Sequence, residues 1–343
     1  MIVQDAAPAH NGVAREALDA ASRVYNGAAL IASDTGRQEL ARTWCWRHAE
    51  HYLAHLPLSG TLAQRALEPV VNLARLRIRA GDGEQAFTML TALHEGVRTR
   101  QAITVDGRAL SLDRLTATEK DHAELRQWLW AVVLADGLRA LTSAGRWEEA
   151  AEQAQQHGGV GDRLFDGRQS VIIAHLLSGR AEQASALIEG STVREPWEQA
   201  LRAVLDLWCR VELADETRMA VGELYRSVGG ALDVKRPLFS TRLGLAALHL
   251  LHRAGAETAD LTDTVTAIAL RAKDGYAARD LLNSWKTTND QNQELSRILT
   301  TSGLTGNGLP THLNERLTNA VTMASDKLDS AFLTTAVAGQ DTG

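Results

Sequence analysis

One segment of the chain concentrates side chains that could do chemistry. Residues 44–55 have the sequence WCWRHAEHYLAH. On a helix, Trp44, His48, His51 and His55 fall on one face, and two imidazoles one turn apart can share a metal ion. The zinc-protease pattern His-Glu-x-x-His is absent, however, and no acidic or cysteine ligand can be assigned. We therefore expect no metal ion and interpret the segment as a histidine-and-aromatic surface, with a ligand-contacting face as the alternative.

A second polar group opens a long helix. Asp121 and Glu124 lie one turn apart, and His122 stands between them. Such residues could take part in acid–base or metal chemistry, but acidic residues at a helix start are also expected from the helix dipole. Together with His48 and His51, Asp121 and His122 are the candidate catalytic residues if the protein is an enzyme.

The most glycine-rich loop covers residues 157–163, with the sequence HGGVGDR. A phosphate-binding loop needs a preceding strand, and a P-loop also needs Gly-Lys-Ser/Thr; neither is present. We therefore expect a plain connection between helices. Just beyond it, Arg163, Arg168 and Gln169 are expected on an inner face, where they are candidates for contacting an acidic partner.

Tryptophan supplies much of the aromatic content. Trp44 and Trp46 form one pair two residues apart, and Trp128 and Trp130 form another. Residues at this spacing on a helix cannot point to one face. One member of each pair is therefore expected to face a groove or a partner, where Trp is a typical anchor.

Composition narrows the class of protein. The 343 residues are 45% hydrophobic and 5% aromatic, with a net charge of −6, which argues against disorder and against a general nucleic-acid coat. The two cysteines are expected as small buried residues in a reducing compartment. No signal peptide or membrane span is recognisable. We expect a cytoplasmic protein without a cofactor, direct nucleic-acid contact or membrane contact.

Hydrophobic periodicity predicts helices almost throughout. In residues 62–78, apolar side chains recur at helical spacing, with arginines on the opposite side. The best strand signal is short, at residues 102–106, and residues 101–115 are expected to form an irregular connector. These observations predict an all-α protein.

A turn signature recurs between the predicted helices. It appears as AGDGEQA at residues 80–86, AGRWEEA at 144–150 and SGRAEQA at 178–184, with a weaker echo at 254–259. In each copy, the Gly is expected to take the left-handed conformation that ends one helix, and an acidic residue stabilises the start of the next. The signature predicts antiparallel helical hairpins.

Over about residues 60–190 the chain resembles the tetratricopeptide repeat family. Gly145, Trp147 and Ala150 stand at the family's turn glycine, bulky residue and small packing residue, and Gly145 and Gly179 are one repeat of 34 residues apart. The resemblance implies hairpins stacked as an α-solenoid. It also implies a concave face that binds peptides or partner proteins.

Four segments are predicted along the chain. A helical-repeat domain occupies residues 1–300, with the connector at 101–115, and a linker covers 301–312. A helix at 313–334 is expected to cap the stack or to form a homodimer, and residues 335–343 are expected to be a mobile tail.

The leading functional hypothesis is a module that binds a protein or peptide partner, as a scaffold, adaptor or regulatory accessory protein. Its candidate anchors are Trp44, Trp46, His48, His51, His55, Trp128, Trp130, Arg163, Arg168 and Gln169. One alternative is an all-α enzyme or small-molecule binder with a pocket lined by His and Asp. Another is a ligand-sensing regulator without a DNA-binding domain of its own.

Overall fold

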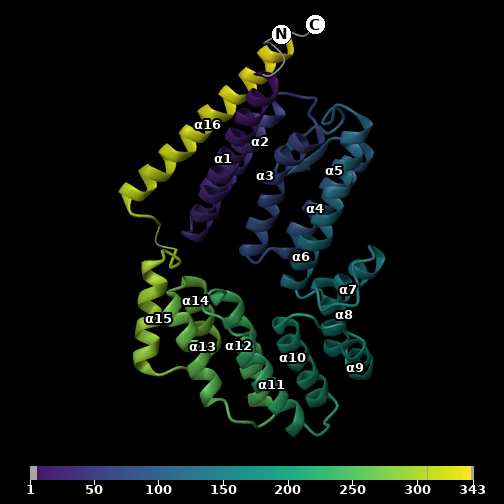
Figure 1. The fold of residues 1–343 in the computed structure, drawn as a ribbon, viewed down its shortest axis with the longest axis vertical. Helices are drawn as coiled ribbons and strands as arrows, with labels where there is room; N and C mark the ends of the chain where they lie inside the picture. Colours follow the sequence, from purple (N-terminus) through teal and green to yellow (C-terminus); the bar gives the residue numbers. More distant parts are fainter. Residues whose placement is uncertain (1–5, 307, 341–343) are drawn as a thin grey trace. The chain divides into compact units, whose positions relative to one another are not determined.

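The computed structural model describes residues 6–306 and 308–340 of the chain (Figure 1). These residues are mostly α-helical, and the strands among them are the short antiparallel pair β1 (Ile103–Val105) and β2 (Arg108–Leu110). The predicted all-α class is therefore confirmed. Within the described part, no helix is both long and apolar enough to cross a membrane.

Two compact units divide the chain, and each is described by itself. Unit 1 comprises residues 1–144 and 306–343, and unit 2 comprises residues 145–305. The single repeat domain predicted for residues 1–300 therefore extends over both units. The boundary falls inside the repeated turn signature at residues 144–150, so the sequence pattern gives no sign of it.

Unit 1 contains an N-terminal run of helices and one helix from the far end of the sequence. The helices are α1 (Ala6–Asp34), α2 (Gln38–Leu53), α3 (Gly60–Arg79), α4 (Gly83–Thr99), α5 (Glu119–Val132), the π-helical turn η1 (Val133–Gly137), α6 (Leu138–Ser143) and α16 (Thr311–Gln340). Consecutive helices pack on each other, and α16 packs along α1. One continuous hydrophobic core joins α1 to α5 with α16.

Polar contacts of nearly constant sequence separation connect α1, α3 and α5. Partners 45 or 46 residues apart join α1 to α3, as in the 3.0 Å hydrogen bond from Asn72 to Asn26. Partners 61 residues apart join α3 to the helix of α5 and η1, as where Arg75 donates to Asp136. A nearly constant separation means that the helices run in one direction in a fixed register. These three helices therefore form one layer.

Unit 2 continues the pattern with shorter helices. They are α7 (Trp147–Gln156), α8 (Asp166–Leu177), α9 (Ala181–Glu189), α10 (Pro196–Glu212), α11 (Arg218–Ala231), α12 (Pro237–Arg253), α13 (Ala259–Ala272), α14 (Gly275–Ser284) and α15 (Asn289–Thr301). Besides its neighbours in sequence, α12 packs on α10 and on α14. Alanine and leucine supply most of the core between them.

The glycines of the turn signature adopt the predicted conformation. The φ angles are 84° at Gly81, 75° at Gly145, 71° at Gly179 and 66° at Gly255. At Gly179, the amides of the glycine and of the next residue donate to carbonyls in the last turn of α8, which satisfies groups that a helix end leaves unpaired. The prediction of left-handed turns is therefore confirmed at these positions.

The connector contains a short hairpin, and the C-terminal helix is longer than predicted. Residues 101–115 contain the β1–β2 hairpin, and α16 begins at Thr311 and continues past residue 334. The backbone of residues 335–340, predicted as part of a mobile tail, thus belongs to this helix. The rest of that predicted tail, residues 341–343, lies outside the described residues.

Candidate functional site

Helix α2 carries most of the histidine and tryptophan segment, and three of the five candidate side chains there face inward, whereas His51 is partly buried and His55, just after the helix, is exposed. Trp44, Trp46 and His48 are buried, because α1 packs on one side of α2 and α3 on the other. A helical wheel of α2 alone cannot show that both sides are covered. The predicted partner surface on these three residues is therefore part of the core of unit 1.

His48 lies in a buried polar group between α1 and α2. Its Nε2 is 3.0 Å from Ser22 Oγ, which is 3.0 Å from Tyr52 Oη, and its ring stacks on Tyr25 at 4.9 Å. Among the described residues, His48 Nδ1 has no hydrogen-bond partner. Burial lowers the pKa of His48 from 6.5 to about 3, with a further contribution from His51. The imidazole is therefore neutral inside the folded protein.

His51 connects α2 to α16. Its Nδ1 is 2.8 Å from Asp329 Oδ1, and its Nε2 is 2.9 Å from Ser325 Oγ and 3.2 Å from Tyr25 Oη. This is the hydrogen-bond order of a Ser-His-Asp triad. Nearby, the ring of His55 stacks on Phe332 of α16 at 4.2 Å.

The surroundings of Ser325 do not suit acyl transfer. Ser325 is buried in the middle of α16, where backbone amides donate to carbonyls four residues earlier. An oxyanion hole needs donors that are free to meet a developing charge. The His51 contacts therefore serve to hold α16 on α1 and α2. The described residues also contain no cluster of three or more His, Cys, Asp or Glu placed to hold a metal ion.

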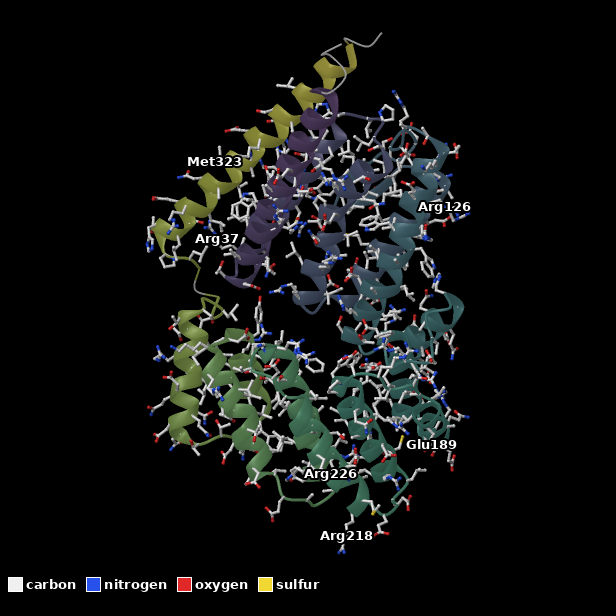
Figure 2. The ribbon with its side chains drawn as sticks, in the orientation of Figure 1. Arg37, Arg126, Glu189, Arg218, Arg226 and Met323 are labelled. Carbon is white, nitrogen blue, oxygen red and sulfur yellow. The ribbon has the colours of Figure 1, made fainter. Side chains whose placement is uncertain are left out.

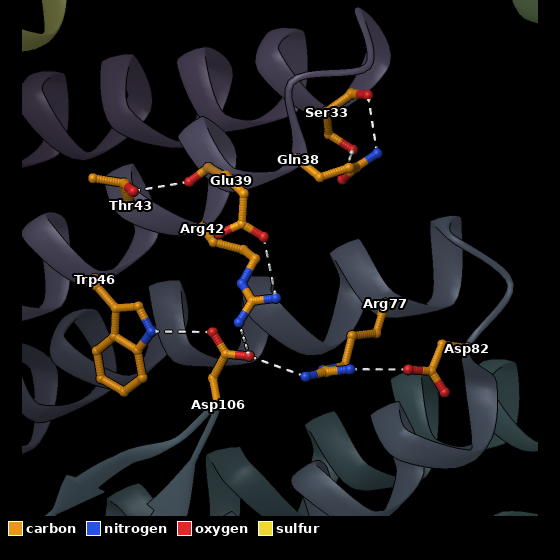
Figure 3. Close-up of polar contacts among 9 residues, drawn as sticks. All are labelled: Ser33, Gln38, Glu39, Arg42, Thr43, Trp46, Arg77, Asp82 and Asp106. Carbon is orange, nitrogen blue, oxygen red and sulfur yellow. Dashed lines mark hydrogen bonds and ion pairs between the residues drawn. The ribbon is translucent and has the colours of Figure 1, made fainter. Parts of the chain in front are cut away.

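Trp46 contributes to a charged cluster at the tip of the β1–β2 hairpin (Figure 3). The carboxylate of Asp106 is 4% exposed, and it accepts hydrogen bonds from Arg42 at 2.6 Å and Arg77 at 3.0 Å. Trp46 Nε1 donates to the same carboxylate at 3.4 Å. The indole is thus committed to holding the hairpin against α2 and α3.

The polar residues at the start of α5 attach this helix to α3. Asp121 accepts hydrogen bonds from Thr118 Oγ1 and from the Gly60 amide, both at 2.6 Å, and these bonds lower its pKa. His122 is buried, and desolvation lowers its pKa. The two side chains have different neighbours: Asp121 is bonded to Thr118 and Gly60, whereas the charged groups near His122 are Arg100, Arg126 and Glu119.

The second tryptophan pair divides as its spacing suggests. Trp128 is half-buried against the core of unit 1, whereas Trp130 is exposed.

The arginines after the glycine-rich loop bind groups of unit 2 itself. Arg163 donates through Nε and Nη2 to the buried carboxylate of Glu198, at 2.8 and 2.9 Å, and this pairing lowers the pKa of Glu198 to about 2. Arg168 donates to two carbonyls and to Ser191, and Gln169 donates to the Leu164 carbonyl. These guanidinium and amide groups stabilise the loop instead of facing outward as a set.

Arg163 also belongs to a partly exposed group of aromatic and arginine side chains. We call it the aromatic–arginine row; its members are Arg163, Phe165, Trp197, Arg236 and Phe239. Phe165 is 51% exposed and Phe239 is 38% exposed, and their ring centroids lie 6.1 and 6.5 Å from that of Trp197. The guanidinium of Arg163 lies 4.5 Å from the Phe165 ring, and that of Arg236 lies 5.5 Å from Phe239.

Three helix starts position this row. Phe165 immediately precedes α8, Trp197 is in the first turn of α10, and Phe239 is in the first turn of α12. The sequence carries a local signal for these rings, because an arginine stands two or three residues before each of them, at Arg163, Arg194 and Arg236. Because these segments are far apart in sequence, only the packing of the hairpins brings them together.

Comparisons with known proteins leave the function to be argued from this geometry. No family model matches the chain, and no curated protein or solved structure matches it.

Proposed function

We propose that the protein is a cytoplasmic helical-repeat module, stacked as a tetratricopeptide-like α-solenoid, that binds a protein or peptide partner as a scaffold or adaptor. Successive helical hairpins with left-handed turns support the repeat architecture. Two unpaired, buried cysteines agree with a reducing compartment.

The aromatic–arginine row is the observation that carries this proposal. Aromatic and arginine side chains are enriched among the residues that dominate binding energy at interfaces. Here Phe165 is 51% exposed although Arg163 and Trp197 both contact its ring. The ion pair with buried Glu198 fixes Arg163 before any partner arrives, so less side-chain entropy is lost on binding.

The row favours a partner segment with flat or apolar side chains. The ring faces offer stacking and apolar contact. The acidic Asp162, Asp166 and Glu195 lie at the same helix starts, so the row presents no excess of positive charge. A peptide bearing proline or aromatic residues therefore fits it better than a nucleic acid does.

A peptide selection tests the proposal. Peptides selected from a displayed random library on the full chain are measured by fluorescence anisotropy against the wild type and against Phe165→Ala/Phe239→Ala. Loss of two central aromatic anchors is expected to cost about 2 kcal/mol or more, roughly a 30-fold weaker Kd. The matched control is Met219→Ala, which removes an apolar side chain that is 81% exposed elsewhere in unit 2.

The control variant is expected to bind like the wild type. If no peptide is enriched, or if the selected peptides bind the double variant and the wild type equally, the row is not the binding surface.

A further inference from the structure

A second surface lies in unit 1, along the seam between α1 and α16. Tyr25 of α1 lies at Ser325, and Arg37, just after α1, donates to Asn314. The numbering thus rises along one helix as it falls along the other, so the two helices are antiparallel. Between them is a groove of about 170 Å³, lined by Ala20, Ala21, Val24, Ala320, Met323, Ala324 and Lys327.

The groove is apolar and open to solvent. Four of its lining residues are alanines, which leave space for another backbone to approach. Met323 of α16 is 63% exposed (Figure 2), and Val24 and Ile31 add exposed apolar surface on α1. An exposed methionine beside a shallow groove is a flexible contact for an incoming side chain.

Positive charges flank the groove on α16. Arg316, Ala320, Met323 and Lys327 follow one another at spacings of four, three and four, so they share one face of the helix. Arg316 and Lys327 are both exposed, and neither forms an ion pair with any residue that the structure describes. In a chain of net charge −6, an apolar stripe bounded by two unpaired cations favours an acidic partner.

We propose that the α1–α16 groove binds an amphipathic helix of a partner protein. Its apolar stripe covers Met323 and enters the alanine-lined groove, and Asp or Glu residues on either side meet Arg316 and Lys327. This is recognition of a helix in a groove, with anchors repeating at helical spacing. The surface is separate from the aromatic–arginine row of unit 2, so the proposal goes beyond the proposed function and implies a scaffold with two binding surfaces.

Charge makes a second copy of this chain a poorer occupant. In an antiparallel pair of α16 helices, the symmetry that sets Met323 against Ala320 of the other copy also sets Arg316 against Lys327. Like charges opposite each other oppose association. A partner helix with acidic flanks meets the same two cations favourably.

The experiment selects the partner chemistry without assuming a sequence. A displayed library of helical peptides is selected on the 343-residue chain and counter-screened on Met323→Glu, whose exposed position tolerates a polar side chain. Enriched peptides are expected to have apolar residues at helical spacing between acidic residues, and to bind Met323→Glu about tenfold more weakly. The matched control is Leu333→Glu, which changes a side chain of α16 that is 67% exposed and away from the groove.

Charge reversal gives the sharper result. The double variant Arg316→Glu/Lys327→Glu is expected to bind the acidic peptides more weakly than the wild type does. It is expected to bind the same peptides when Lys replaces Glu in them. Enrichment of nothing, enrichment of basic peptides, or equal binding to Met323→Glu and wild type would overturn the proposal. So would a concentration-dependent dimer, seen by light scattering, that Met323→Glu abolishes. Binding to Phe165→Ala/Phe239→Ala is expected to be unchanged, which separates this test from that of the aromatic–arginine row.

Discussion

Replacement of Asp106 tests how the β1–β2 hairpin is attached to unit 1. The residue has two separate roles. Its buried carboxylate accepts hydrogen bonds from Arg42 and Arg77, and its backbone has a φ of 55°. Substitution of Asp106 by Asn, Gly or Ala removes these contributions in different combinations. The three variants can therefore be ranked in advance by their loss in the free energy of unfolding.

The magnitudes follow from those two roles. Hydrogen bonds to charged groups contribute about 1.5–3 kcal/mol, and the value here is toward the lower end because Arg42 and Arg77 are roughly a third exposed and can be rehydrated. A left-handed conformation costs alanine about 1 kcal/mol. Asp106→Ala is therefore expected to lose about 3 kcal/mol and Asp106→Gly about 2 kcal/mol. Asp106→Asn, which keeps an acceptor oxygen and tolerates this φ, is expected to lose about 1 kcal/mol.

Urea unfolding by circular dichroism measures the free energies, and hydrogen exchange over residues 101–115 reports the hairpin directly. Asp113→Asn is the control, because it changes an exposed acid of the same connector, and it is expected to alter stability by less than about 0.5 kcal/mol. Equal losses for Asn and Ala at position 106, or a loss below about 1 kcal/mol for Ala, would refute both the charge and the backbone arguments.

Three further predictions concern buried groups and turns. Burial raises the pKa of Cys45 and of Cys209 to about 12, so neither thiol is expected to react with a disulfide reagent near neutral pH until urea unfolds the chain; rapid labelling of the native protein would contradict this. The pKa of His48 is about 3 when folded against 6.5 otherwise, so the unfolded state binds the extra proton, and stability is full above 6.5 and falls as the pH drops towards 3. Between about pH 7 and about pH 5, the free energy of unfolding of the wild type is expected to fall by about 2 kcal/mol more than that of His48→Gln, which urea titration at each pH measures. Gly179→Ala, at a φ of 71°, is expected to cost about 1 kcal/mol, whereas Gly229→Ala, in α11 with open space around it, is expected to stabilise slightly; equal melting temperatures would refute the turn assignment.

Local features of this fold could be predicted from sequence, and long-range ones could not. Helical periodicity and the Ala-Gly turns depend on residues that are close in sequence. The positive φ angles of Gly81 and Gly179 agree with the turns predicted there. The burial of Trp44 depends on which helices cover α2, and periodicity carries no such information. Arg163 was expected to face a partner. Its acceptor, Glu198, lies 35 residues further along the chain, so the sequence around Arg163 does not reveal this ion pair.

The same limit applies to the aromatic–arginine row and to the α1–α16 groove. Phe165 and Phe239 each look like an ordinary residue at a helix start, and only the packing of α8, α10 and α12 assembles them. Met323 looks like one more apolar residue of an amphipathic helix, yet it is 63% exposed. In both cases the sequence predicts the helix but not which other helix packs beside it.

The position of α16 has a consequence for the order in which unit 1 is assembled. During synthesis, α1 and α2 leave the ribosome well before their partner helix α16, which follows only after residues 145–305 have been made. Until then, Tyr25 and Tyr52, both fully buried in the finished fold, lack the cover that α16 provides. The packing of α1 and α2 is therefore completed only after α16 has been made, so apolar surface on these two helices stays uncovered while the intervening helices form.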